Sequence, residues 1–165
     1  MRHSKPIGTP FTGTSTEHID EWSREVFVAL SEWAKAHYGR WTRWEPGYLL
    51  LEIDTMGDDA IDPILMDTAD EELTVEFGYW EMHLPDQAQD APGAAREAVE
   101  LASQWLSGEI KTAVFTDANG KWCGSKTVQR GDPLPPKPID GLKGFNPTQV
   151  EVRAARKSER QTFAI

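Results

Sequence analysis

Residues 110–128 read IKTAVFTDANGKWCGSKTV, and this stretch decides the fold. Two runs rich in β-branched and apolar residues, 110–116 and 121–128, flank the tetrapeptide Asp117-Ala118-Asn119-Gly120. Asn-Gly between strand-like runs is a strong hairpin signal, because both residues adopt the left-handed backbone that tight turns need. The stretch therefore predicts two antiparallel strands.

Three more strand-like runs lie upstream of this hairpin. They are residues 48–54 (YLLLEID), 64–68 (ILMDT) and 73–83 (LTVEFGYWEMH). The first run is apolar at nearly every position, which is typical of a strand covered on both faces. The third alternates, so that Leu73, Val75, Phe77 and Tyr79 point one way, and Thr74, Glu76, Gly78 and Trp80 the other. We predict one continuous strand over residues 73–83.

Two amphipathic helices are predicted from apolar residues at spacings of three and four. The first follows a cap at Ser15 or Thr16 and ends at Gly39, and its stripe is Ile19, Trp22, Val26, Leu30, Trp33 and His37. The second runs from about residue 93 to residue 107, and Gly108 ends it. Because each helix has one apolar stripe, we expect Trp22, Trp33 and Trp105 in the core with Val75, Phe77 and Val99.

The C-terminal part of the chain begins with a proline-rich segment. Residues 131–138 read GDPLPPKP, which neither a helix nor a sheet accommodates, so we expect an extended surface strap over residues 131–147. Asn146-Pro147 favours a helix after it, whereas Val150, Val152 and Ala154 alternate as in a strand over residues 149–155. Both alternatives stay open, and the alternation favours the strand.

These elements predict an α+β fold: an antiparallel sheet of about five to six strands with two main helices packed on it. The order is helix, three strands, helix, two strands and an uncertain last element. We predict an irregular lead-in at residues 1–14, a single α+β domain at 15–130, the strap at 131–147, and a C-terminal element, strand or helix, with a tail at 148–165.

An acidic block occupies the middle of the chain. Between Trp44 and Ala95 there are 14 Asp and Glu residues and no Lys or Arg, in a chain whose net charge is −10. We expect these acids to form a negative surface that repels nucleic acid and anionic membranes and attracts a basic protein partner. No apolar run follows the basic start, and Cys123 has no second cysteine to pair with, so we expect a cytoplasmic protein.

No metal, cofactor or catalytic motif is found in the sequence. The acidic loop at residues 54–62 lacks the alternating acids of a calcium-binding loop, and the four histidines lack zinc spacing. Neither a phosphate-binding glycine loop nor a hydrolase elbow occurs. We therefore predict no metal site, no cofactor and no catalytic residue, with a non-enzymatic role favoured.

One segment nevertheless has the composition of a binding surface. Glu81 and His83 lie two residues apart on a strand-like run, so their side chains project from the same face. An exposed Trp on an acidic strand is typical of an interface anchor. The residues predicted to bind a partner are Trp80, Tyr79, Glu81, His83, Asp58 and Asp59. A small enzyme that uses Glu81 and His83 as an acid–base pair is the alternative.

Over residues 49–128 the chain resembles small bacterial immunity-type proteins. The likeness lies in the layout of three segments, LTVEFGYWEMH (73–83), WLSGEI (105–110) and NGKWCGS (119–125), together with size and acidity. These proteins are cytosolic inhibitors encoded beside polymorphic toxins, so the resemblance implies an inhibitor of a basic toxin. The order of elements is also similar to that of type III secretion chaperones, which are small, acidic and dimeric. This chain is longer than they are and carries an additional proline strap.

Overall fold

The computed structural model describes residues 8–14, 18–54, 62–84, 90–141 and 144–165. Within these ranges the chain forms two α-helices, α1 (Glu21–Ala36) and α2 (Ala91–Ser107). The strands are β1 (Thr9–Pro10), β2 (Arg40–Trp44), β3 (Tyr48–Ile53), β4 (Ile64–Asp67), β5 (Leu73–Phe77), β6 (Trp80–Leu84), β7 (Ile110–Thr116), β8 (Trp122–Gln129), β9 (Gln149–Arg153) and β10 (Gln161–Ala164). Short 3-10 turns cover Ala69–Glu71 and Lys157–Glu159. The α+β class predicted from the sequence is confirmed.

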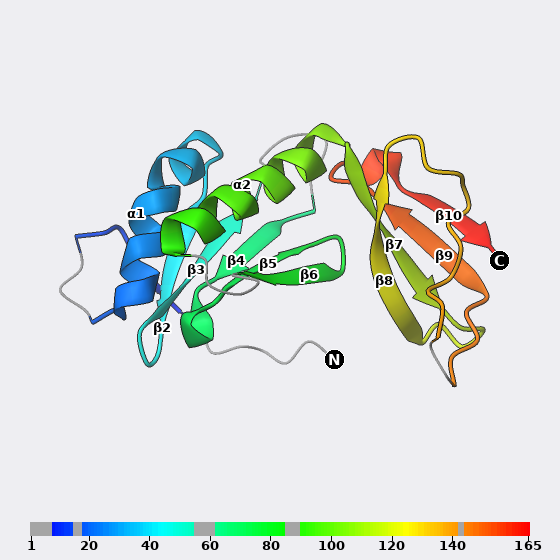
Figure 1. Cartoon of the computed structure of the whole chain (residues 1–165), viewed down its shortest axis with the longest axis horizontal. Coiled ribbons are helices and arrows are strands. Elements are labelled where there is room, and N and C mark those ends of the chain that lie inside the picture. The colour runs from blue at the N-terminus through cyan, green and yellow to red at the C-terminus, as the bar shows by residue number, and fades with distance from the viewer. Residues whose placement is uncertain (1–7, 15–17, 55–61, 85–89, 142–143) are drawn as a thin grey trace. The chain divides into compact units, whose positions relative to one another are not determined.

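The strands divide between two sheets (Figure 1). Six strands follow chain order from β1 to β6, and four strands form a second sheet in the order β10-β9-β7-β8. The sequence led us to expect one sheet, because strand patterns do not reveal which edges pair. Here β9 pairs with the edge of β7 that β8 leaves open, so the last four strands complete a sheet of their own.

The chain forms two compact units. The first comprises residues 1–54, 64–75 and 82–99, and the second comprises residues 55–63, 76–81 and 100–165. In the first unit, α1 packs against β3. It also lies beside the first turns of α2, where Ala29 of α1 and Ala95 of α2 line the same small hollow (Figure 1). Its buried core includes Val26, Leu30, Leu51 and further side chains from β3 to β5.

Helix α1 begins later than the sequence led us to expect, and the row of side chains that it buries is also different. Asp20 is its N-cap, and the Asp20 carboxylate accepts a hydrogen bond of 2.7 Å from the Ser23 backbone N–H. The predicted cap at Ser15 or Thr16 lies outside the described residues. The buried face is Ser23, Val26, Leu30 and Ala34.

Two tryptophans of α1 are therefore not core residues, contrary to the prediction. Trp22 and Trp33 are half-buried at the edges of the stripe, where Trp33 stacks on His37 at 4.4 Å between ring centres. The physical reason is size, because small residues at positions 23 and 34 let the helix approach the sheet more closely than indole rings allow. Val99 is also only half-buried, whereas Trp105, Val75 and Phe77 are buried as predicted.

The run at residues 73–83 is a hairpin and not the single strand predicted. Strands β5 and β6 are joined by Gly78 and Tyr79, whose φ angles are +55° and +68°. Two positive φ angles in a two-residue loop are the mark of the turn that best fits the twist of paired strands. A further strand, not predicted from the sequence, is β2, which contains Trp41 and Trp44 and pairs with β3.

The second unit is built around its four-stranded sheet. The Asn119-Gly120 hairpin is confirmed as β7 and β8, and the strand alternative for the C-terminal element is confirmed as β9, to which β10 adds. One face of the sheet buries a cluster of Ala113, Phe115, Cys123, Val128 and Val150. Ile139 from the predicted strap packs against this cluster, and the described part of residues 131–147 contains no helix or strand.

Candidate functional site: an aromatic and acidic groove

The site begins with the tip of the β5–β6 hairpin, residues 76–81, which belong to the second unit. Thr112 of β7 donates a hydrogen bond of 2.6 Å from its hydroxyl to the Gly78 carbonyl. The fully buried Trp105 stacks on Phe77, with ring centres 4.8 Å apart and planes at 24°. A Cβ added at Gly78 would lie 2.4 Å from the Thr112 hydroxyl oxygen, so only glycine fits there. The tip is thus fixed by packing and not only by its own turn.

This anchoring presents Tyr79 to solvent in a strained backbone conformation. Its φ of +68° is rare for a bulky residue, for which the left-handed region costs about 1–2 kcal/mol. The Tyr79 side chain remains 57% exposed, although its ring meets Trp122 of β8 edge-on at 6.2 Å. Strain of this kind gathers at functional sites, where the surrounding structure holds it in place.

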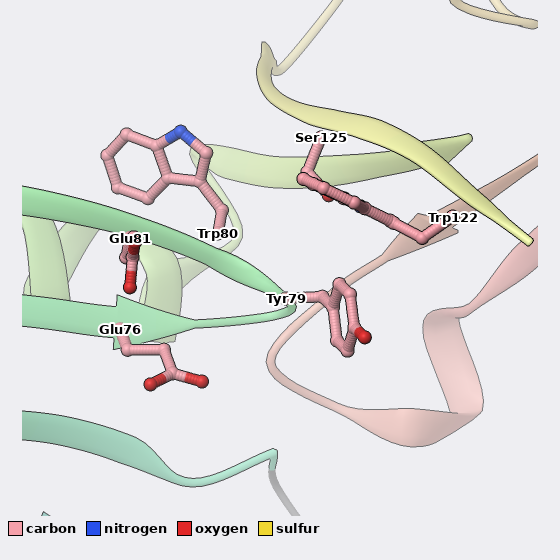
Figure 2. Close-up of a pocket in the computed structure, with 6 residues that line it drawn as sticks. All are labelled: Glu76, Tyr79, Trp80, Glu81, Trp122 and Ser125. Atoms are coloured by element: carbon pink, nitrogen blue, oxygen red, sulfur yellow. The ribbon is translucent and has the colours of Figure 1, made fainter. Parts of the chain in front are cut away.

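A groove of about 440 Å³ opens beside the tip (Figure 2). Its lining, called the aromatic groove below, consists of Glu76, Tyr79, Trp80, Glu81, Trp122 and Ser125. All six belong to the second unit. Figure 2 shows Tyr79 and Trp122 on one side of this space and Trp80 on another. The volume lies in the range of small-ligand and side-chain pockets.

The three aromatic rings of the groove are held in defined orientations. The Trp122 indole N–H donates to the Ser125 hydroxyl at 2.9 Å, which fixes the plane of a ring that is 49% exposed. Trp80 rests on Phe77 with ring centres 5.2 Å apart and is half-buried. Large aromatic rings that are both rigid and exposed lose little conformational entropy on binding a partner.

The two acids of the groove lie directly opposite each other on the hairpin. A two-residue turn pairs Phe77 with Trp80 and therefore Glu76 with Glu81, and the side chains of both acids are exposed. The contact of 3.0 Å between the Thr74 hydroxyl and His83 Nδ1 two positions further along fits this register. Like charges directly across a strand pair repel, and neither acid is without a partner in the chain.

A second, smaller hollow of about 260 Å³ shares Tyr79 and Trp122 with the aromatic groove. It contains Arg153 of β9, whose guanidinium carbon lies 5.5 Å from the centre of the Tyr79 ring. Arg153 Nε lies 2.8 Å from Oε1 of Glu151. Glu151 also lies 3.8 Å from the Arg160 guanidinium, so alternating charges extend along this side of the sheet.

The structure brings together some of the residues that the sequence predicted as a binding surface. Tyr79, Trp80 and Glu81 all line the groove. His83 does not, because its Nδ1 lies 3.1 Å from Oε2 of Glu72 in the first unit. Asp58 and Asp59 lie outside the described residues, as does most of the loop considered for calcium.

Other lining residues were missed in the sequence. Glu76, Trp122 and Ser125 were not predicted as binding residues, although Trp122 follows the Asn-Gly turn, where a side chain on a short hairpin is readily exposed. The useful signal for the tip was Gly78, since a glycine inside a strand pattern often marks a turn or a close backbone approach.

Arginines from outside the acidic block bind several of its carboxylates. The pairs are Arg40 with Glu52, Arg43 with Glu45, and Arg160 with Asp62. The Arg43 hydrogen bond and charge lower the pKa of the Glu45 carboxyl. Burial, followed by the Asp67 and Asp70 charges, raises the pKa of the Tyr48 hydroxyl above its ordinary value of 10.0. The expected negative surface is therefore interrupted around these pairs.

Outside the groove, the described residues supply few other chemical groupings. Among them, no three His, Cys, Asp or Glu side chains gather as metal ligands do. No helix in the described ranges combines the length and apolar character needed to cross a membrane. The chain matches no family model, and no curated protein or solved structure is significantly similar to it.

Proposed function

We propose that this chain is a non-enzymatic binding protein that holds a basic protein partner through the aromatic groove. The observation that carries the proposal is one cavity whose lining includes three aromatic residues and two acidic ones. Aromatic side chains supply most of the affinity of protein interfaces, whereas exposed charges mainly raise the association rate. The groove combines both components within one compact unit.

The wider charge of the chain supports the same role. With a net charge of −10, the protein attracts a basic molecule over distances of about a Debye length, which is about 8 Å at physiological salt. The exposed Tyr79 and Trp122 then provide the apolar contact that slows dissociation.

The biological role that we propose is that of an immunity-type inhibitor of a bacterial toxin, acting in a reducing compartment such as the cytoplasm. Small size, acidity and a preformed binding groove suit a protein that must capture one basic partner quickly. A secretion-type chaperone would instead be a stable homodimer in the absence of its client. Analytical ultracentrifugation of the purified chain separates the two roles, and the inhibitor role predicts a monomer that forms a heterodimer with its partner.

The test of partner binding starts with affinity capture from an extract of the native cell, followed by association and dissociation kinetics on the captured protein. The double variant Glu76→Gln, Glu81→Gln should slow association, with a difference that disappears at high salt. The matched control is the double variant Glu25→Gln, Glu32→Gln on α1, which changes net charge equally at exposed positions that do not line the groove. Equal rates for the two double variants would contradict the proposal.

A second pair of variants tests the aromatic contact. Trp122→Ala should speed dissociation about 30-fold, as expected when an interface anchor worth about 2 kcal/mol is removed. Tyr38→Ala is the control, because Tyr38 is 81% exposed and lies on the first unit. If Tyr38→Ala speeds dissociation as much as Trp122→Ala does, the partner binds elsewhere.

A further inference from the structure

Strand β8 is the last strand of its sheet, and the register with β7 shows which of its residues face the outer edge. Arg130, directly after β8, donates its backbone N–H to the Glu109 carbonyl at 2.8 Å, so these two residues form a hydrogen-bonded pair. Hydrogen-bonded pairs alternate with non-bonded pairs along antiparallel strands. The backbone N–H and C=O groups of Gln129, Thr127 and Ser125 therefore point away from β7.

Asp132 occupies the outward groups of Gln129. Its carboxylate accepts the Gln129 N–H at 2.9 Å, and its own backbone N–H donates to the Gln129 carbonyl at 3.1 Å. Both bonds agree with the outward direction that the register assigns to Gln129. At Ser125 and Thr127, no hydrogen bond from the described residues reaches the outward backbone groups. These two N–H and two C=O groups are called the open edge of β8 below.

The open edge adjoins the aromatic groove. Ser125 lines the groove together with Trp122 of the same strand and with Tyr79 (Figure 2). Residues that lie directly opposite each other on paired strands place their side chains on the same face of the sheet. A residue paired with Ser125 in an added strand would therefore direct its side chain to the face that carries the groove. An extended segment can thus use the open backbone groups and the aromatic rings together.

We propose that an extended segment of the partner pairs with the open edge of β8 as a fifth strand of this sheet and places an apolar side chain in the aromatic groove. This inference rests on the proposed function and specifies how the partner binds. Strand addition draws its affinity from main-chain hydrogen bonds and its specificity from pockets for alternate side chains. A basic partner is favoured over a second copy, because two chains of net charge −10 repel each other.

The opposite edge of the sheet, at β10, provides a matched comparison. Ile165 donates its backbone N–H to the Thr148 carbonyl at 3.0 Å in the register that pairs β10 with β9. By the same alternation, the backbone groups of Thr162 and Ala164 point away from β9. Neither residue lines the aromatic groove. We therefore expect the added strand at β8 and not at β10.

The probe is a synthetic peptide, Ac-Lys-Thr-Lys-Leu-Lys-Thr-Lys-NH₂, which is basic and has one apolar side chain at its centre. Because main-chain pairing depends little on sequence, this peptide tests the edge before the partner is identified. It is titrated into the full chain labelled with ¹⁵N, and the backbone amide signals of Ser125 and Thr127 report on β8. Those of Thr162 and Ala164 report on β10. A second peptide contains N-methylleucine, which removes the central N–H and keeps the charge.

We expect the first peptide to shift the Ser125 and Thr127 signals to saturation and to leave the β10 signals nearly unchanged. The N-methyl peptide should bind about tenfold more weakly, because one main-chain hydrogen bond is lost and its acceptor stays unpaired. Thr127→Pro removes an outward N–H at a position where an edge strand accepts proline, and it should weaken binding about tenfold. Thr162→Pro is the matched control on β10 and should leave the affinity unchanged.

Equal binding of the two peptides, equal effects of the two proline variants, or the absence of saturable shifts at β8 would overturn the inference. If Thr127→Pro does not fold, the comparison of the two peptides on the native chain decides. A homodimer in which the Ser125 and Thr127 amides are already protected from hydrogen exchange would overturn it too.

The inference and the proposed function can fail separately. The proposed function would still stand without strand addition if binding of the captured partner depends on Trp122. Conversely, peptide binding at β8 together with a captured partner that does not depend on Trp122 would support the added strand and contradict the role of the groove in binding that partner.

Discussion

Gly78→Ala tests whether the hairpin tip is held by close packing. The new Cβ would lie 2.4 Å from the Thr112 hydroxyl oxygen and 2.6 Å from the Trp105 ring, so side chains or backbone must move. Overpacking of this kind costs about 1–3 kcal/mol, and the positive φ of +55° adds about 1–2 kcal/mol for a residue with a Cβ. We therefore expect a loss of about 2–5 kcal/mol, which is a large share of the stability of a typical domain.

Gly120→Ala is the matched control for this substitution. Its φ is +76°, and a Cβ there would meet no atom within 4 Å, so only the backbone term of about 1–2 kcal/mol applies. Both glycines belong to the second unit, so guanidinium chloride unfolding followed by tryptophan fluorescence reports on the same structure. The difference between the two variants in the free energy of unfolding therefore measures the cost of crowding at the hairpin tip. Equal losses for both variants would refute the close packing of Gly78 against Thr112 and Trp105.

Three further outcomes are expected from the same structure. Tyr79→Gly should raise the free energy of unfolding by about 1 kcal/mol in denaturant titrations, because it relieves the left-handed strain, while it weakens partner binding. Trp105→Ala should cost about 3–5 kcal/mol and Trp33→Ala clearly less, since only Trp105 is fully buried, and similar midpoint shifts would contradict this. The raised pKa of Tyr48 means that the folded state favours the neutral phenol, so its stabilising effect is complete below pH 10 and is lost as pH rises above it. Unfolding titrations from pH 8 to pH 11 should therefore show a steeper loss for the native chain than for Tyr48→Phe.

Short sequence patterns predicted the elements whose formation depends mainly on one local feature, such as a turn or an alternation of apolar residues. The Asn119-Gly120 turn needs left-handed backbone at defined positions, so it identified β7 and β8 from the sequence alone. The alternation of Val150 and Val152 likewise identified β9. In the run at residues 73–83 the apolar alternation continued up to Tyr79, so the two-residue turn at Gly78 and Tyr79 remained hidden until the backbone angles were known.

The candidate site could be predicted only in part. Tyr79, Trp80 and Glu81 were recognised from composition, because an exposed aromatic among acids is unusual for a core strand. Glu76 and Trp122 were not, since their place in the groove depends on the reversal of the chain at Gly78 and on the approach of β8 to the tip. Spacing along a sequence carries no information about contacts across more than 40 residues.

The sequence by itself determined the α+β class, the central hairpin and the acidic character, because turn chemistry, periodicity and charge are local properties. Only the tertiary structure decided which strands share a sheet, which tryptophans are buried, and which acids pair with arginines. Strand pairing and side-chain burial depend on the fit of surfaces from separate segments. Small side chains such as Ser23 and Ala34 exclude the neighbouring indole rings from the core, and Gly78 lets Trp105 and Thr112 position Tyr79 at the groove.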